Sequence, residues 1–293
     1  MDNLRNNGII SNLKLRASVG KVGNDGLGST RFLYLDNIDL QYHTSHIPSL
    51  GNGGKIYERM VGNKNIHWEV AWKQNYAVDL TLFDDLDLTF DYFIEDRSDI
   101  LIERNTVPAI SGLTSSQLPR VNMGEIKNKG YEITLDYNTD ITRDLNINFG
   151  GNFSYARNKV IAADEAVLSS DYAYRYRETG FSLGQNWGYI IDHTVDPEHG
   201  KDGSGFFNSK EDVINSGLTY ETGGGIPQPG DFIYKDLNGD HIINEKDMAP
   251  IKYSSLVPRI SYGFHIGASY KGFDFSVMFQ GVGQYSKYYS GRG

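Results

Sequence analysis

The sequence lacks cysteine and long apolar runs, and each absence excludes certain classes of protein. Its 293 residues include no cysteine, which excludes disulfide frameworks, thiolate zinc sites and cysteine nucleophiles. No segment approaches the roughly 18 consecutive apolar residues of a transmembrane helix. The mean hydropathy of −0.45 is that of a polar chain. The sequence therefore predicts neither a disulfide-stapled module nor a helical membrane protein.

Concentrated basic charge and familiar catalytic spacings are also missing. The 28 Lys and Arg are outnumbered by 37 Asp and Glu, for a net charge of −9, which argues against nucleic acid as a partner. The seven His show no H-E-x-x-H spacing, and Gly23, Gly26 and Gly28 lack the Lys-Ser/Thr ending of a phosphate loop. We assign no catalytic or cofactor-binding residue, and expect no enzyme.

Apolar and polar residues alternate over 79–82 and again over 86–94. A period of two is that of a strand with one apolar and one polar face, and the short gap between the runs predicts a tight turn. Strands of soluble sandwiches usually last about 5–6 residues. These runs support strands of roughly 9 or more, enough to cross a bilayer when tilted. Strand length therefore favours a membrane barrel.

The same alternation recurs along the chain and gives about seven strands in all. The further runs are 13–19, 131–137, 145–155, 260–270 and 273–279. The tight turns between paired runs all lie at one end of the hairpins, whereas the connections at the other end are long, from 20 to 68, 104 to 120 and 160 to 257. Outer-membrane barrels combine short periplasmic turns with long extracellular loops. The asymmetry therefore predicts that Asp84, Asp140 and Lys271 face the periplasm.

These patterns predict an all-β fold, a partial transmembrane antiparallel β-barrel with long extracellular loops in the outer membrane. We divide the chain into barrel strands and loops at 1–160, a large extracellular loop region at 161–257, and a barrel hairpin at 258–293. Residues 1–12 are polar and contain no apolar core of a secretory signal. Since an outer-membrane protein must be exported, we expect this chain to be part of a longer protein.

Several colinear segments resemble the SusC/RagA-type TonB-linked outer-membrane transporters of Bacteroidetes. The resembling segments are Leu13 to Asn24, Gly62 to Glu69, Asn122 to Glu132, Pro229 to Asp240 and Tyr270 to Ser276. The resemblance implies a C-terminal fragment of a TonB-dependent receptor that imports glycan or peptide nutrients. It further implies a SusD-like surface lipoprotein as a partner, TonB as a partner through a missing N-terminal part, and outer-membrane lipid around the barrel. A chain with two open sheet edges is not expected to be a stable monomer on its own.

One segment, Asp236 to Asp247, has the oxygen spacing of a calcium loop. Oxygens at its first, third, fifth, seventh, ninth and twelfth positions match the way such loops surround Ca²⁺. The predicted ligands are Asp236, Asn238, Asp240, the Ile242 carbonyl, Asn244 and Asp247. His241 replaces the usual Gly at the sixth position, and Asp247 replaces the usual Glu at the twelfth. A surface turn rich in Asx and Gly, without an ion, is the alternative.

Aromatic residues are the candidate substrate contacts, because their faces stack on sugar rings. The candidates are Trp68, Trp72, Trp187, Tyr172, Tyr174 and Tyr176, with Arg175 and Arg177. Interfacial or loop packing is the other interpretation of these residues, so we assign no substrate pocket. Two alternatives to the transporter stay open: a secreted, β-rich, calcium-stabilised glycan-binding module, and a β-fold glycoside hydrolase, whose carboxylate pair is defined by separation in space.

Overall fold

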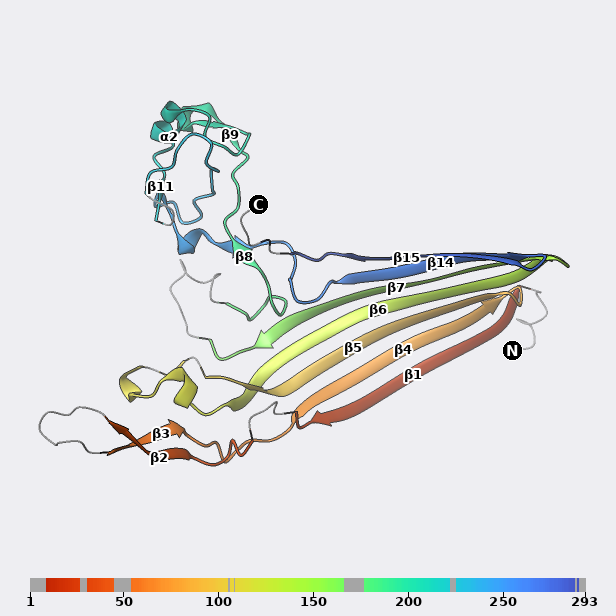
Figure 1. Ribbon diagram of the computed structural model, residues 1–293, viewed down its shortest axis with the longest axis horizontal. Coiled ribbons are helices and arrows are strands. Elements are labelled where there is room, and N and C mark those ends of the chain that lie inside the picture. Colours follow the sequence, from red (N-terminus) through yellow and green to blue (C-terminus); the bar gives the residue numbers. More distant parts are fainter. Residues whose placement is uncertain are drawn as a thin grey trace, which may run out of the picture. The chain divides into compact units, whose positions relative to one another are not determined.

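The computed structural model describes residues 9–26, 31–44, 54–104, 106–107, 109–165, 177–221, 225–287 and 289. It divides into two compact units (Figure 1). Unit 1 comprises Met1–Ala166 and Arg259–Gly283, and unit 2 comprises Val167–Pro258 and Gln284–Gly293. The terminal strand of the predicted last hairpin ends at Gly283, and the ten residues after it group with unit 2.

Unit 1 is built on one antiparallel sheet of seven strands, in the order β1-β4-β5-β6-β7-β14-β15. Figure 1 shows these strands side by side, with the three tight turns at the same end. The strands are β1 (Ile10–Asn24), β4 (Glu69–Leu82), β5 (Leu86–Ile102), β6 (Val121–Thr142), β7 (Leu145–Ala162), β14 (Ile260–Tyr270) and β15 (Phe273–Gly283). The predicted strand number and the common end of the turns are both confirmed.

Most strands are longer than the alternation indicated. The longest, β6, has 22 residues, which corresponds to roughly 70 Å of extended chain. A tilted strand needs only about 9–11 residues to cross a bilayer. On β5 and β6 many of the additional residues at the end away from the tight turns, such as 95–99 and 125–129, are polar or charged, so apolar periodicity does not reveal them. The alternation therefore placed this end of the strands too close to the tight turns.

The register places apolar side chains on one face of the sheet and polar side chains on the other. Directly paired residues share a face, and one row of such pairs runs through Val78, Phe90, Ile133, Phe153 and Tyr262. The adjacent row, one residue along each strand, runs through Asp79, Thr89, Thr134, Asn152, Gly263 and Gln280. We call these the apolar face and the polar face.

The connection between β1 and β4 contains secondary structure that the sequence did not reveal. β2 (Asn37–Thr44) and β3 (Gly54–Met60) pair as an antiparallel hairpin. Two 3₁₀ turns, η1 (Ala109–Ser111) and η2 (Ser115–Gln117), lie in the connection between β5 and β6. Gln117 ties the two connections together, because its side chain donates to the Glu58 carbonyl at 2.6 Å and its own carbonyl accepts from Val61 N at 2.9 Å.

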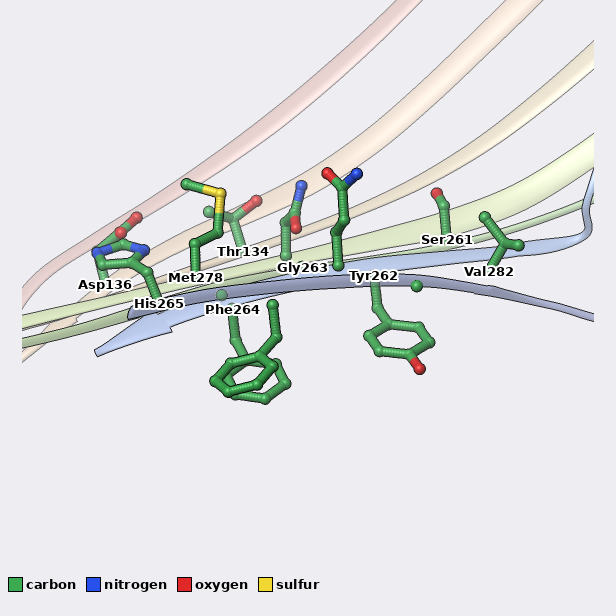
Figure 2. A pocket seen from close by; sticks show the side chains of 14 residues that line it. Thr134, Asp136, Ser261, Tyr262, Gly263, Phe264, His265, Met278 and Val282 are labelled. Atoms are coloured by element: carbon green, nitrogen blue, oxygen red, sulfur yellow. The ribbon is translucent and has the colours of Figure 1, made fainter. Parts of the chain in front are cut away.

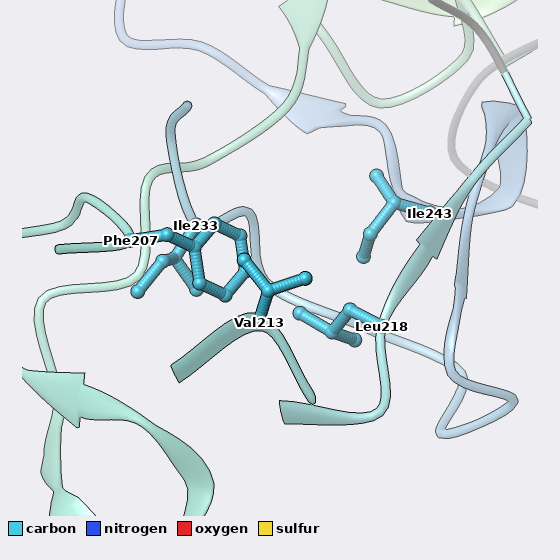
Figure 3. Close-up of a cluster of buried hydrophobic side chains, with 5 residues drawn as sticks. All are labelled: Phe207, Val213, Leu218, Ile233 and Ile243. Atoms are coloured by element: carbon cyan, nitrogen blue, oxygen red, sulfur yellow. The ribbon is translucent and has the colours of Figure 1, made fainter. Parts of the chain in front are cut away.

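Unit 2 has short elements around a small core. Phe207, Val213, Leu218, Ile233 and Ile243 are buried against one another (Figure 3). The region predicted as a large loop thus carries a packed apolar cluster of its own. The elements are β8 (Trp187–Gly188), β9 (Val195–Asp196), η4 (Pro197–His199), β10 (Lys201–Asp202), α2 (Lys210–Ser216), β11 (Thr219–Tyr220), β12 (Ile242–Ile243), η5 (Glu245–Asp247) and β13 (Ala249–Pro250). Among the residues that the structure describes, no helix is long and apolar enough to cross a membrane.

Candidate functional site

The polar face of the sheet is hollowed where β6, β7, β14 and β15 lie side by side. A groove of about 760 Å³ is lined there by residues that include Thr134, Asp136, Asn152, His265 and Gln280. Figure 2 shows Thr134, Asp136, His265 and Met278 on one side of the sheet, and the Tyr262 and Phe264 rings on the opposite side. The groove therefore offers hydrogen-bonding groups on a wall whose reverse side is aromatic.

Strand glycines leave room for polar side chains on this face of the sheet. A Cβ on Gly150 would lie 2.2 Å from His265 Cε1 and 2.6 Å from Asp136 Oδ1. A Cβ on Gly267 would lie 2.5 Å from Asn148 Oδ1. The His265 and Asn148 side chains therefore occupy the space above the backbone that a larger residue would fill, which is a known reason for glycine inside a strand.

An arginine links three strands on the same face. The Arg16 guanidinium donates to both carboxylate oxygens of Asp79, from Nε at 2.8 Å and from Nη2 at 2.7 Å. Nη2 also lies 3.4 Å from Asp91 Oδ2. These residues come from β1, β4 and β5, and the bidentate geometry fixes the guanidinium plane. The interaction therefore sets the position of edge strand β1 against its neighbour β4 and the next strand, β5.

The predicted calcium loop is an oxygen-rich turn closed by its own backbone. Asp236 accepts from Gly239 N at 2.7 Å and from His241 N at 2.8 Å. Asp240 accepts from Ile242 N at 2.8 Å, and its Oδ2 accepts from the Asn238 side chain at 2.9 Å. These hydrogen bonds hold the pKa of the Asp240 carboxyl below its usual range. His241 adopts a φ of 62°, so histidine takes the left-handed conformation that glycine usually provides at this position.

Asp247, the last predicted ligand, closes the loop. Its side chain is fully buried, and its two oxygens accept from Leu237 N at 2.8 Å and Asn244 N at 2.9 Å. Asn244 Oδ1 in turn accepts from Lys246 N at 2.9 Å. No group of three His, Asp or Glu side chains that could hold a metal is present in the described part of the chain, although the predicted ligand set also uses Asn238, Asn244 and a carbonyl. Calcium binding at Asp236, Asn238, Asp240, Ile242, Asn244 and Asp247 stays a prediction.

The aromatic candidates do not form one site. Trp68 and Trp72 belong to unit 1 and are largely exposed, and the Trp72 ring lies 6.0 Å from Lys21 Nζ. Trp187 belongs to unit 2, where it meets Phe181 edge to face with ring centroids 4.8 Å apart. Arg177 is exposed. The remaining candidates, Tyr172, Tyr174, Arg175 and Tyr176, lie outside the described residues.

Sequence reasoning missed the residues that shape the polar face, although signals for some were present. Gly150 and Gly267 interrupt strands that are otherwise rich in side chains, and strand glycines mark a close approach of other groups. Arg16 is a cation at an alternating polar position, and aspartates recur at the polar positions of 79–91. Its partners depend on the register between β1 and β4, which are separated by a long connection, so the sequence alone could not pair them.

The sheet has the properties of a membrane-barrel wall. Its strands are long enough to span a bilayer, its apolar face carries exposed aromatic and aliphatic side chains, and its opposite face is polar. Outer-membrane barrels have this division, with lipid outside and a polar interior. The fold therefore defines the class, an antiparallel transmembrane β-barrel, of which the seven strands form an unclosed part.

The family model for "TonB dependent receptor-like, beta-barrel" matches residues 6–292. The chain belongs to this family, and its location is the outer membrane. Two TonB-dependent receptors of Formosa agariphila are similar to it: P39, 27% identical over 93% of this chain, and P26, 29% identical over 95%. The chain spans 27% and 26% of these relatives, about a quarter of their length.

Solved structures show the same fold. A structure of the RagAB peptide importer in the 'closed-closed' state superposes with a TM-score of 0.64, at 20% identity over 94% of this chain and 27% of that one. The 'open-open' state gives a TM-score of 0.63, at 20% identity over 95% of this chain and 26% of that one. The predicted kinship with SusC/RagA-type barrels is thereby confirmed at the level of family and fold.

Proposed function

We propose that this chain forms part of the barrel wall of a TonB-dependent outer-membrane importer that takes up glycans or peptides. One observation carries the proposal: seven membrane-length strands present an apolar face to lipid and a hollowed, hydrogen-bonding face to the barrel interior. A wall of this kind encloses a path that polar nutrients can follow across the membrane. The likeness to the RagAB peptide importer supports a nutrient as cargo.

The partners follow from the same proposal. TonB would act through parts of the receptor that precede this chain, and a SusD-like surface lipoprotein would capture the glycan or peptide outside. The long connections at the end of the sheet away from the tight turns are the parts of this chain available for such a contact. We accordingly propose that this end faces the exterior and that the turns at 83–85, 143–144 and 271–272 face the periplasm.

Deletion of the full receptor gene in its native host tests the function. Growth is measured on a panel of glycans and a panel of peptides as the sole nutrient, with the reintroduced gene as the control. We expect growth to fail on members of one panel, to return with the gene, and to fail equally when TonB is removed. A passive pore would keep working without TonB. Unchanged growth on both panels, or growth that needs the receptor but not TonB, would contradict the proposal.

The lipoprotein partner has its own test. The full-length receptor is extracted from native membranes in mild detergent through an affinity tag, and copurifying proteins are identified. We expect a surface lipoprotein in a stoichiometric complex. A receptor that elutes without any lipoprotein would remove this part of the proposal but leave import untouched. The outer-membrane location of the family argues against the alternative of a secreted glycan-binding module.

A further inference from the structure

Four cations lie together on β6 and β7 in an arrangement that the sheet by itself does not favour. Lys129 pairs directly with Arg157, and Lys127 pairs directly with Lys159. All four side chains are exposed. Like charges directly opposite each other on neighbouring strands repel and destabilise the pair. Two such pairs in succession therefore call for a negatively charged partner.

Acidic neighbours neutralise only part of this charge. Asp96 on β5 lies 3.1 Å from Lys127 Nζ. Within the described ranges, no ion pair involves Lys129, Arg157 or Lys159, and Glu125 forms none with this group. We call the four residues Lys127, Lys129, Arg157 and Lys159 the basic cluster. Its net charge within the sheet is positive, although the chain as a whole is acidic.

The basic cluster is on the apolar, lipid-facing side of the sheet. Residues two apart on a strand share a face, so Lys129 lies on the same face as Tyr131, and Arg157 on the same face as Tyr155. Tyr131 and Tyr155 pair directly, with ring centroids 5.5 Å apart. The next pair toward the turn is Ile133 with Phe153. The cluster thus follows directly on a tyrosine pair that ends the apolar stretch.

Distances along the strands place the cluster at the level of lipid headgroups. On β7 the stretch from Leu145, beside the tight turn, to Tyr155 contains 11 residues by their numbers, and a tilted strand crosses the hydrocarbon core in about 9–11. Tyrosine is enriched at the membrane interface. Lys129 and Arg157 are two residues farther, about 7 Å along the strand, and Lys127 and Lys159 about 13 Å. The headgroup layer adds roughly 5–8 Å on each side of the core.

In the described part of the sheet, the tight-turn end carries its cations singly and beside acidic residues. Its turns contain Asp84, Asp85, Arg143 and Asp144, and Lys271 lies 3.8 Å from Asp144 at this end. Directly opposed cations on the lipid-facing side are therefore a feature of the long-loop end. A mixture of lysine and arginine at headgroup depth suits phosphate groups, which accept several hydrogen bonds from guanidinium and ammonium donors.

We propose that the basic cluster binds the phosphate groups of anionic lipids in the membrane leaflet at the long-loop end of the barrel. The lipid headgroup supplies the negative charge that the sheet lacks, and the phosphate bridges the two strands between their paired cations. The binding also holds β6 and β7 at a fixed depth in the membrane. This inference requires the membrane location of the barrel but is independent of its cargo, so a failure of the transport proposal would leave it standing.

The experiment uses the full-length receptor purified in a neutral detergent. Native mass spectrometry follows the binding of phosphatidylglycerol and of phosphatidylcholine, titrated separately. The test variant is Lys129→Gln/Arg157→Gln, which removes a repulsive pair and so leaves folding intact. The matched control is Lys210→Gln/Lys252→Gln, which removes the same charge from exposed positions in unit 2. Lys129→Arg is a second variant that keeps the charge.

We expect the unmodified receptor to prefer phosphatidylglycerol and the test variant to bind it about 30-fold more weakly. Each of the two removed cations contributes about five- to sixfold to the affinity for an anionic surface. The control and Lys129→Arg should match the unmodified receptor. Equal affinity for the two lipids, or a test variant that still prefers phosphatidylglycerol, would overturn the inference. Displacement of the lipid by an excess of inorganic phosphate would show a site for free phosphate and would also overturn it.

Discussion

The loop-closing role of Asp247 leads to a quantitative prediction about Asp247→Ala. The buried carboxylate holds Leu237 N and Asn244 N, residues seven positions apart, at 2.8 and 2.9 Å. Hydrogen bonds to a charged group contribute about 1.5–3 kcal/mol each. Water can reach the amides once the side chain is removed, which offsets part of the loss, so we expect the loop to lose about 2–4 kcal/mol of local stability.

Hydrogen exchange on the full-length receptor in detergent measures this loss. Exchange of the amides of Leu237 and Asn244, followed in peptides that cover the loop, should become between about 30-fold and several hundred-fold faster. Asp240→Ala is the matched control, because Asp240 is exposed and its loss frees two hydrogen bonds at the surface, from Ile242 N and the Asn238 side chain; we expect a change of less than about fivefold. Equal exchange in the unmodified receptor and in Asp247→Ala would refute the closing role.

The same assay separates loop closure from calcium binding. If the backbone hydrogen bonds suffice, the two amides remain protected when a chelator removes calcium. Bound calcium would add protection: at a concentration about 100 times the dissociation constant, the gain is about 2.7 kcal/mol, close to 100-fold slower exchange. The gain should be absent in Asp236→Asn, which removes a charged ligand. Identical exchange with calcium and with chelator would eliminate the calcium prediction and leave the closing role intact.

Three further predictions rest on other parts of the molecule. Gly150→Val should reduce the yield of folded receptor in the outer membrane, at a cost of about 1–3 kcal/mol from overpacking against His265, whereas Gly20→Ala, whose Cβ would meet nothing within 4 Å, should fold normally. In unit 2, burial opposes the charge of Asp192, but hydrogen bonds from Lys201 and Thr194 outweigh it and lower the pKa of that carboxyl. The ionised carboxylate therefore stabilises the folded state above its unfolded pKa, and this stabilisation is lost as pH falls through its folded pKa. Lys201→Met should accordingly speed hydrogen exchange of the 192–202 segment at neutral pH but not in acid. Lys210→Met is the silent control. The isolated 293-residue chain should not elute as a monodisperse, cooperatively melting species without detergent, and a sharp peak that melts cooperatively would contradict this.

Residue alternation was enough to predict the sheet but not its exact registration. Over 86–94 and 145–155 one face is apolar, and the strands follow directly. The pairing of β6 with β7 shows where counting fails. From Thr142 opposite Leu145, simple counting would place Lys129 opposite Asn158, but the irregularity between Asp140 and Thr142 shifts the register by one residue. Lys129 therefore pairs with Arg157, and the one-residue shift places two cations directly opposite each other.

The packed core of unit 2 could not be predicted from the sequence, for a different reason. Its core residues come from an α-helix, from strands of two residues and from irregular segments, so no period of two or of 3.6 connects them. The Asp236 to Asp247 segment was recognisable because its oxygens have a fixed spacing. The structure shows why the segment keeps its shape: Asp247 is the only one of its predicted ligands that is fully buried among the described residues. A spacing rule ranks all six positions equally, whereas burial distinguishes them.

The two units obtain their stability from different surroundings. Unit 2 buries Phe207, Ile233 and Ile243 almost completely. The seven-stranded sheet instead leaves large apolar side chains uncovered, with Leu15 73% and Phe273 80% exposed. A single sheet has no second layer to cover its apolar face, and a domain needs one. In the outer membrane the lipid acts as that layer on one face, while neighbouring strands must pair with the free edges of β1 and β15. The alternation in this sequence therefore suits a sheet with lipid on one face, and the basic cluster lies at the edge of the hydrocarbon layer.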